Sequence, residues 1–527
     1  MLPGTFLRSA NFRMLRARHF AIAAGLLTLL TLLFVPQLQA QSAGSTYPRP
    51  KFHDKIVSGL DSLFSMRVDA SIRIFSQIVD ADPKDPTGYF FRANVYLWKY
   101  LFNKNERDFS TYMSESEKTI DIGEDYLDLH EDDSFTRALI GGTYGYRALA
   151  NITAENFLTA SWDVRSCYRY LGELIQEHPD EYEAYLGMGI FQFALGSLPA
   201  SARTVLNLVG LDGNREIGLR QLQTAATKAT YVRNDARFTL ALLYVYYKND
   251  YDKGVGLLKD LLKEYPNNVP VLYSMGNVEG QLRKLEGAIW YFDQIIELDN
   301  KDFSYFTGYA NMRRAEAQFR LNNFVETMRG MQRFLKIVPD KTMRCLAYFR
   351  LGIAYEMGGD RKNAEEAYRR ASTLRPVTPE DQYANRKAAL YLKKPLDAIE
   401  KELIRGANDV EAHKFDSGRQ LLQPIAANRN ATADQRAEAA YFLGEALRHS
   451  QEYNQALTAY KQVIELQPKG ETWLIPWAYF RLSQVYWELG DKKSHRVYLD
   501  RSQVYDDYDY KDWLDFQIDR DLTRLQQ

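Results

Sequence analysis

Residues 345 to 378 read CLAYFRLGIAYEMGGDRKNAEEAYRRASTLRPVT, and this stretch decides the fold. A first set of residues recurs at i, i+3, i+4 and i+7, which places them on one face of a helix: Tyr348, Leu351, Gly352 and Tyr355. The run Gly358-Gly359-Asp360 then interrupts the helix. A second set shares one face of the next helix and ends at a proline: Ala364, Tyr368, Ala371 and Pro376. The stretch therefore predicts two antiparallel amphipathic helices.

This pattern resembles the tetratricopeptide repeat, a helix–turn–helix unit of about 34 residues. Small residues at Gly352 and Ala364 let the two helices approach closely, and the tyrosines fill the seams. The same pattern recurs elsewhere along the chain, at Gly276, Ala288, Gly444, Ala456, Tyr460 and Pro468. The resemblance implies an all-α fold, an α-solenoid of antiparallel helix pairs forming a right-handed superhelix.

Length and composition agree with a solenoid. The chain has 527 residues, which is too many for one compact core unless the fold is built from repeats. Its 36 tyrosines suit the seams between repeats and also suit binding surfaces. Cys167 and Cys345 lie far apart in the sequence, so we expect neither a disulfide nor a zinc site.

Residues 1–40 have the character of a signal peptide. An apolar run from Phe20 to Val35 follows a basic region, and Leu38-Gln39-Ala40 offers a cleavage site. An uncleaved anchor is the alternative. A periplasmic or outer-membrane-associated location would follow, without the lipidated cysteine of a lipoprotein. The net charge is −1, and loss of the four arginines in this segment would lower it to −5, which argues against nucleic acid as a partner.

The rest of the chain divides into four further parts. Residues 41–52 are a polar leader, and residues 53–378 are predicted to form an N-terminal repeat solenoid with an apolar insertion at 198–211. The pattern loosens over 379–430, which we interpret as an irregular helical joint. Residues 431–527 restore the repeats and end in a helix predicted to cap the last one.

A more particular pattern lies between residues 182 and 247. A G-x-G-x-F helix at Gly187 is followed by Leu198-Pro199, an apolar segment and G-x-R-E-x-G from Gly213, with an aspartate or asparagine placed to cap the next helix. This combination resembles the tetratricopeptide repeat protein 39 family, which includes fungal inclusion-body-clearance proteins linked to outer mitochondrial membranes. A signal peptide departs from that eukaryotic pattern, so the resemblance implies the fold and not the cellular role.

The sequence offers no persuasive catalytic constellation. It contains no phosphate-binding loop, no H-E-x-x-H and no C-x-x-C. Gly187-Met188-Gly189 follows no strand and is interpreted as helix-packing glycine. The acidic runs beside His130 and around Asp506 lack the pattern of a metal site, since the glycine and terminal glutamate of a calcium loop are missing. We therefore expect no catalytic residue, no cofactor, no metal and no small-molecule substrate.

A stripe of large residues is the candidate binding surface. In five repeats the residue after the first seam residue is apolar, and four steps later a polar residue often follows; the predicted partner groove comprises Tyr273, Asn277, Met312, Phe349, Tyr441 and Phe480. Aromatic anchors contribute strongly at interfaces. The alternative is that the stripe packs between repeats. Capture of a partner's C-terminal carboxylate is disfavoured, because the stripe itself carries no lysine or arginine.

The leading hypothesis is an exported, non-enzymatic repeat scaffold that binds a protein partner through its concave helical surface. The alternative is an outer-membrane-associated glycan-binding protein with embedded repeats, for which abundant tyrosine and tryptophan would suit sugar stacking. Membrane contact through residues 198–211 is disfavoured, because Arg203 is their only basic residue. The identity of the partner stays open.

Overall fold

The fold is all-helical in the computed structural model, which describes residues 51–198 and 212–525. These residues form twenty-four α-helices, one π-helical turn (η1) and one 3-10 turn (η2), and none of them lies in a strand. The predicted all-α class and its antiparallel helix pairs are therefore confirmed. The predicted signal peptide, most of the leader and nearly all of the apolar insertion fall outside the described residues. The handedness of the superhelix stays a prediction.

The chain divides into two compact units, each described on its own. The N-terminal unit comprises the described residues up to Val278 together with Gln294–Thr307, and the C-terminal unit comprises Glu279–Asp293 and the residues from Gly308 onward. The helices up to this division are α3 His53–Phe64, α4 Val68–Ala81, α5 Pro86–Asn103, α6 Glu106–Leu127, α7 Ser134–Thr153, α8 Phe157–Glu177, α9 Ala184–Gly196, α11 Arg215–Lys228, α12 Arg233–Leu243, η1 Tyr244–Lys248 and α13 Tyr251–Glu264.

The boundary between the units falls within α14–α16. These segments are α14 Val269–Gln281, α15 Leu285–Leu298, η2 Lys301–Phe303 and α16 Ser304–Arg320. The remaining helices are α17 Phe324–Ile337, α18 Arg344–Met357, α19 Arg361–Thr373, α20 Pro379–Lys393, α21 Ala398–Glu411, α22 Phe415–Ala427, α23 Ala433–His449, α24 Tyr453–Leu466, α25 Leu474–Glu488, α26 Lys492–Ser502 and α27 Lys511–Leu525.

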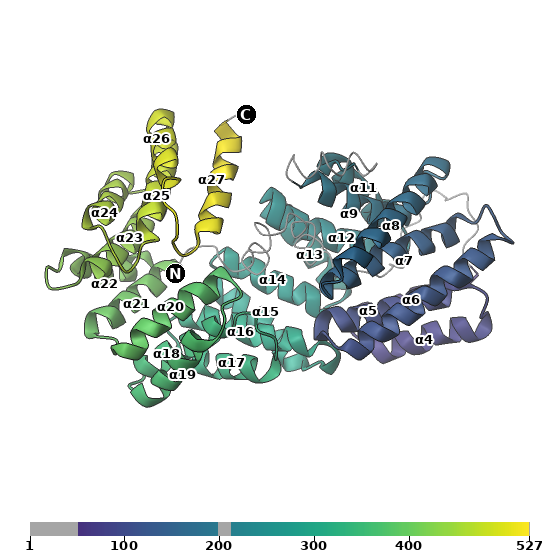
Figure 1. Cartoon of the computed structure of the whole chain (residues 1–527), viewed down its shortest axis with the longest axis horizontal. Coiled ribbons are helices and arrows are strands. Elements are labelled where there is room, and N and C mark those ends of the chain that lie inside the picture. Colours follow the sequence, from purple (N-terminus) through teal and green to yellow (C-terminus); the bar gives the residue numbers. More distant parts are fainter. Residues whose placement is uncertain (1–50, 199–211, 526–527) are drawn as a thin grey trace. The chain divides into compact units, whose positions relative to one another are not determined.

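Within each unit the helices pack as repeats do (Figure 1). Most helices contact the next one in the chain, as α7 and α8 or α23 and α24 do. The first helices of successive pairs also contact one another, as α3, α5, α7 and α9 do in the N-terminal unit. In the C-terminal unit the same relation joins α21, α23 and α25. Such packing forms a layer of first helices and a layer of second helices.

The turn of the hairpin α18–α19 shows why the quoted stretch folds as predicted. Gly359 adopts a left-handed conformation with φ of +84°, which a residue without a side chain tolerates best. Asp360 then accepts a hydrogen bond from the backbone N–H of Asn363 at 3.1 Å and so caps α19. The glycine ends one helix and the aspartate starts the next.

Residues 379–430 differ from the predicted irregular joint. They form three regular helices, α20, α21 and α22. What changes here is which neighbour each helix contacts. The helix α20 packs against α18, which precedes it in the chain, whereas α21 packs against α23, which follows it. The loosened sequence pattern reflects this shift in packing rather than a loss of helix.

The segment before α27 reaches back to α20. The last hairpin itself consists of α25 packed against α26. The segment that leads into α27 instead reaches α20: the Tyr510 ring centroid lies 5.5 Å from that of Tyr383, and Asp509 accepts a hydrogen bond from Arg386 at 2.8 Å. The capping of the last repeat by α27 stays a prediction.

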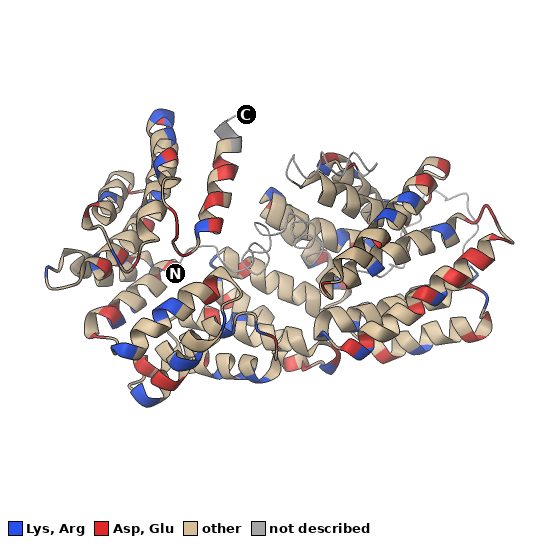
Figure 2. Cartoon of the chain, in the orientation of Figure 1, with Lys and Arg blue, Asp and Glu red and all other residues tan. Residues whose placement is uncertain are grey.

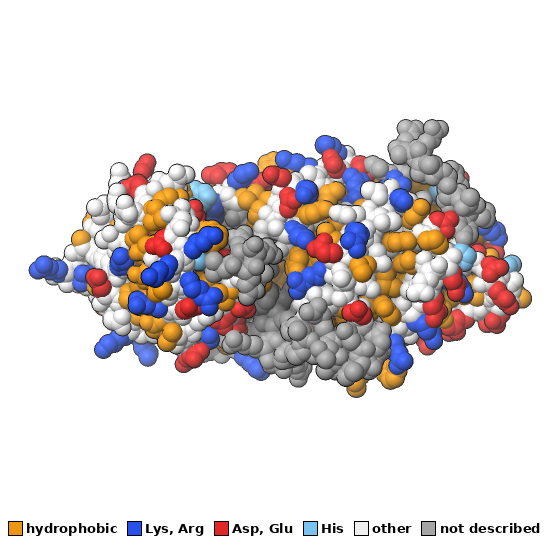
Figure 3. Space-filling model, turned by 90° about the horizontal axis from the view of Figure 1, so that it is seen from above, with side chains coloured by type: hydrophobic (Ala, Val, Ile, Leu, Met, Phe, Trp, Pro, Cys, Tyr) orange, Lys and Arg blue, Asp and Glu red, His pale blue; other side chains and the backbone are white. Residues whose placement is uncertain are grey.

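Charged and hydrophobic side chains are interspersed over the face drawn in Figure 3. Charged residues occur along helices of both units (Figure 2). No helix in the described part of the chain combines the length and apolar character needed to cross a membrane.

Candidate functional site

Glycines set the distance between the two helices of a repeat. A Cβ added at Gly352 would lie 2.4 Å from the Tyr368 ring, and one at Gly444 would lie 2.6 Å from the Tyr460 ring. Both distances are far below ordinary contact, so each tyrosine occupies the space that the glycine leaves. Two predicted packing pairs are thus direct ring-to-backbone contacts.

Most of the other predicted packing residues are buried, namely Leu351, Ala364, Ala371, Gly276, Ala288, Ala456 and Pro468. Tyr348, Tyr355 and Pro376 are only partly buried. Tyr355 accepts a hydrogen bond from Gln332 at 2.7 Å, and the Arg370 guanidinium lies 5.6 Å from the Tyr348 ring centroid. These two tyrosines therefore lie at an outer seam and not in the interior.

The aromatic stripe lies inside the protein. Met312, Phe349, Tyr441 and Phe480 are each at most 1% exposed, and Asn277 is also buried. Phe349 packs against Tyr391, whose ring centroid lies 5.8 Å away, and Tyr441 packs against Trp473 at 5.3 Å. A side chain with no exposed surface cannot serve as an anchor for a partner. The prediction of an open groove is wrong for these five residues, and the alternative, packing between repeats, holds.

Tyr273 is the exception within the stripe. It is half-buried, and its ring meets that of Phe306 edge-on with centroids 5.1 Å apart. One partly exposed tyrosine does not make a groove, so the sequence spacing alone did not identify a binding surface.

Ion pairs behind the stripe join successive repeats. Arg350 donates to Glu316 at 2.8 Å, and Arg481 pairs with Glu445 at the same distance, with all four side chains at most 8% exposed. Each arginine directly follows a residue of the stripe, a position that the sequence analysis did not consider. Buried pairs of this kind cost desolvation but fix the register of the helices they join. Carboxylates of the chain itself already hold both cations.

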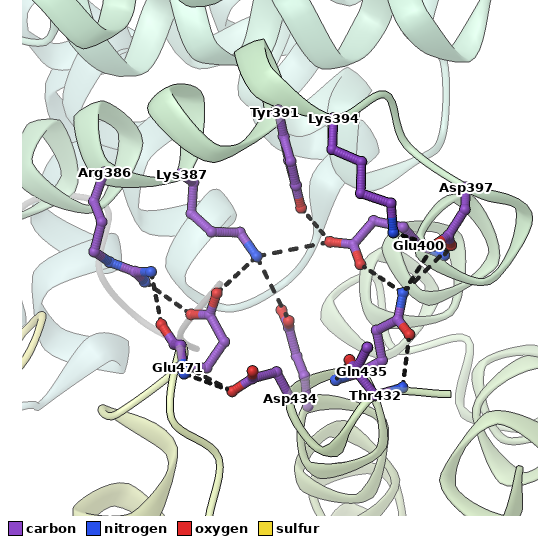
Figure 4. Close-up of polar contacts among 12 residues, drawn as sticks. Arg386, Lys387, Tyr391, Lys394, Asp397, Glu400, Thr432, Asp434, Gln435 and Glu471 are labelled. Carbon is purple, nitrogen blue, oxygen red and sulfur yellow. Dashed lines mark hydrogen bonds and ion pairs between the residues drawn. The ribbon is translucent and has the colours of Figure 1, made fainter. Parts of the chain in front are cut away.

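A buried cluster of charges centres on Lys387 of α20 (Figure 4). The Lys387 ammonium lies 2.8 Å from Glu471, 3.7 Å from Glu400 and 3.9 Å from Glu438. Figure 4 also shows the Tyr391 hydroxyl, which donates to Glu400. The ammonium therefore ties α20 to α21, to α23 and to the loop before α25.

Arg386, next to Lys387, holds the edge of this cluster. Its guanidinium donates to Glu471 and to Asp509, each at 2.8 Å, and to the carbonyl of Gly470 at 2.8 Å. Asp434 accepts from the backbone N–H groups of Gly470 at 2.8 Å and Glu471 at 3.1 Å. The loop before α25 and the segment before α27 are thus fixed by the same side chain.

Two carboxylates of the cluster titrate in opposite directions. Burial raises the pKa of Glu438 to about 7, and Lys387 offsets only part of this effect. Burial also opposes ionisation of Glu471, but Lys387 and Arg386 outweigh it and bring its pKa down to about 2. The pKa of Lys387 is raised although burial opposes it, because its carboxylate neighbours stabilise the ammonium. A lysine that stays protonated is neither a nucleophile nor a base, so the Lys387 ammonium acts here as the cation of a buried ion-pair cluster.

The sequence carried a signal for this cluster that the repeat pattern obscured. Tyr383, Lys387 and Tyr391 recur every four residues, which places a lysine between two tyrosines on one helix face. A lysine on an otherwise apolar face needs a buried carboxylate. The carboxylates come from residues 13 to 84 positions later, so their identity could not be read from local spacing.

The sequence predicted neither a metal site nor a disulfide. Within residues 51–198 and 212–525, no group of three or more histidine, cysteine, aspartate or glutamate side chains is arranged to hold a metal ion. Both cysteines are buried, and burial raises the pKa of each thiol to about 12.

The glycines of the central pattern lie at a helix crossing. A Cβ added at Gly189 of α9 would lie 2.9 Å from the backbone nitrogen of Leu222, and one at Gly218 of α11 would lie 2.5 Å from the nitrogen of Phe193. Asn214 caps α11 by accepting from the backbone N–H groups of Glu216 and Ile217, as predicted. The glycine spacing therefore serves helix packing.

Comparisons with known proteins agree with this architecture. Residues 181–404 match the model of the family described as Iml2/Tetratricopeptide repeat protein 39, and residues 437–469 match the tetratricopeptide repeat. The resemblance of the central region to that family is thereby confirmed.

Several solved structures share low similarity with the chain. Yeast Tom70 is 13% identical, with 85% of this chain and 91% of that one covered and a TM-score of 0.30. Human IFIT1, solved as a dimer with m7Gppp-AAAA, is 13% identical, with 86% and 95% covered and a TM-score of 0.35. MamA is 20% identical, with 40% and 93% covered and a TM-score of 0.21. At such low TM-scores the fold assignment rests on the helix pairs of this chain.

Proposed function

We propose that this tetratricopeptide-repeat scaffold is an exported, non-enzymatic protein that binds a protein partner at its last repeat. The observation that carries the proposal is the outward face of α26. The earlier second helices α17, α19, α22 and α24 each pack against the next helix, which begins the following repeat. On α26 the side chains of Lys493, Arg496, Val497 and Arg501 are exposed.

Apolar side chains are exposed on the terminal hairpin α25–α26 and just after it. Val497 on α26 and Val504 just after it are 43% and 76% exposed, and Trp487 at the end of α25 is also exposed. Exposed hydrophobic side chains that occur singly are ordinary, but several on one terminal hairpin indicate a contact surface. Burial of a large side chain at such a surface stabilises a complex by about 2 kcal/mol.

The packing of the other repeats defines the chemistry of the partner. An amphipathic helix can lie against α26 as the first helix of a further repeat would, which is the helix-in-groove mode of recognition. Lys493 and Arg501 are exposed on the same stretch, so we expect acidic residues beside the apolar face of the partner helix. The solenoid supplies a preformed surface, which lowers the ordering cost of binding.

Export is supported by the basic and then apolar character of residues 1–40. N-terminal sequencing of the protein recovered from the envelope tests it. A mature N-terminus near Gln41 is expected, whereas an intact Met1 in the envelope fraction would favour a retained anchor.

Photocrosslinking in cells tests the partner contact. A photoreactive residue replaces Val497 in one variant and Val504 in another, and a control variant carries it at the exposed Arg369 of α19. The proposal predicts that both test positions capture the same protein and that the control does not. Capture of that protein from the control position alone, or from no position, would contradict the proposed contact.

A further inference from the structure

The second helices of the N-terminal unit carry two exposed patches that remain without a role. One lies on the first half of α8 and the other at the end of α6. Both helices contact α7, which α6 precedes and α8 follows in the sequence. The two patches have opposite charge, and each includes exposed apolar side chains.

The α8 patch consists of Leu158, Trp162, Arg165 and Arg169. Leu158 is 83% exposed and Trp162 is 67% exposed, although they lie one turn apart on the same helix face. The opposite face of α8 is buried through Ala160, Asp163 and Cys167. No carboxylate in the described part of the chain forms an ion pair with either arginine. Tryptophan and arginine, which make up three of the four residues of this patch, are enriched at the energetic centres of interfaces.

The α6 patch consists of Asp121, Asp125, Asp128, Leu129, Glu131 and Asp132. All six are exposed, and Leu129 is 79% exposed. Figure 2 shows acidic residues recurring along α6. Within the described residues none of these five carboxylates has a cationic partner. The patch is therefore the charge complement of the α8 patch.

The relative position of the patches suits a two-fold axis. Tyr170 of α8 donates to Glu124 of α6 at 3.1 Å, which sets these two residues at the same level. Trp162 lies eight residues before Tyr170 and Leu129 five residues after Glu124, so these two apolar side chains are offset by about 20 Å along the helices. A two-fold axis between them would bring each patch of one copy onto the other patch of its partner.

We propose that a second copy of this chain docks on these patches, with α8 of each copy lying against the end of α6 of the other. The contact is isologous, because residue i meets residue j and j meets i. Trp162 and Leu158 would be buried beside Leu129, and the two arginines would meet the aspartates. This dimer does not depend on the partner contact at α26.

Sedimentation velocity over a concentration series of the full chain tests the proposal. We expect a monomer–dimer equilibrium that weakens as salt is raised, since the ion pairs form between exposed groups. Trp162→Ala should weaken the dimer by about 30-fold. Trp290→Ala is the matched control, because Trp290 is an exposed tryptophan outside both patches and its loss should leave the equilibrium unchanged.

A charge swap tests the pairing itself. One variant carries Arg165→Glu and Arg169→Glu, and another carries Asp125→Arg and Asp128→Arg. Each alone should be monomeric, while an equimolar mixture should dimerise, because every contact in the mixed dimer then joins opposite charges. Thermal melts should match the wild type, since all four residues are exposed.

Several results would overturn the proposal. A wild-type monomer at all concentrations would do so, as would a dimer that is indifferent to these substitutions or a mixture that stays monomeric. Sedimentation with vesicles of phosphatidylcholine and phosphatidylglycerol provides a further arm. A monomer that binds these vesicles through Trp162 would assign the α8 patch to a membrane and not to a second copy.

Discussion

The missing side chain of Gly352 sets the spacing of the hairpin α18–α19. We predict that Gly352→Leu lowers the free energy of unfolding by about 2–3 kcal/mol, because the Tyr368 ring already fills the site. Thermal melting by circular dichroism measures the change. Gly256 in α13 is the matched control, since an added Cβ there meets nothing within 4 Å. Gly256→Ala should raise stability by about 0.5–1 kcal/mol, and an unchanged midpoint for Gly352→Leu would contradict the assigned packing.

The raised pKa of Glu438 predicts how the stability of the fold depends on pH. Its folded pKa of about 7 lies above the ordinary value of about 4.3, so its contribution to stability is full below pH 4.3 and is lost as pH rises through 7. Glu438→Gln does not titrate. We therefore expect its stability relative to the wild type to increase from pH 5 to pH 8, by up to about 3 kcal/mol.

Other groups do not confound that comparison. The pKa of Glu471 is about 2, so this carboxylate stays ionised across the range. Burial also raises the pKa of Glu181 to about 7, but this residue is present in both proteins and its effect cancels. Parallel pH profiles of the two proteins would show that Glu438 titrates normally and would contradict the account of the cluster.

At the scale of elements, buried ion pairs connect successive repeats. A double-mutant cycle with Glu445→Leu and Arg481→Met should give a coupling of about 1–3 kcal/mol in stability. The pair Glu366–Arg370 has the same charges one turn apart on the exposed surface of α19 and is the matched control. Its coupling should be about 0.3–0.5 kcal/mol. Equal couplings for the two pairs would mean that burial does not strengthen the contact between α23 and α25.

Local patterns predicted the helices well because helix faces repeat over three to four residues. In the quoted hairpin, with Tyr348 and Gly352 on one face, the first helix ends two residues before Gly359 and the second begins directly after Asp360. The prediction that the aromatic stripe forms an open groove was wrong for a related reason. The spacing correctly groups Phe349 with its equivalents, but whether such a face is open depends on rings such as Tyr391, which come from another helix.

The spacing of residues within a helix does not predict contacts between segments that are far apart in the sequence. The anchoring of Asp509 by Arg386 joins residues 123 positions apart, so the tail was expected to cover the last repeat. Lys387 likewise finds its carboxylates on three other segments. At the scale of the whole molecule, the sequence therefore predicted the repeat class but not which distant segments these side chains join.

Partner binding at α26 is the central claim, and quantitative affinity purification tests it most directly. The full chain is purified from envelope extracts alongside a variant carrying Val497→Asp and Val504→Asp. A second variant carries Val325→Asp, which places the same charge at an exposed valine of α17. The account predicts that one protein copurifies with the wild type and with the Val325 variant and is lost from the double variant. Equal recovery of that protein with all three chains would contradict binding at α26.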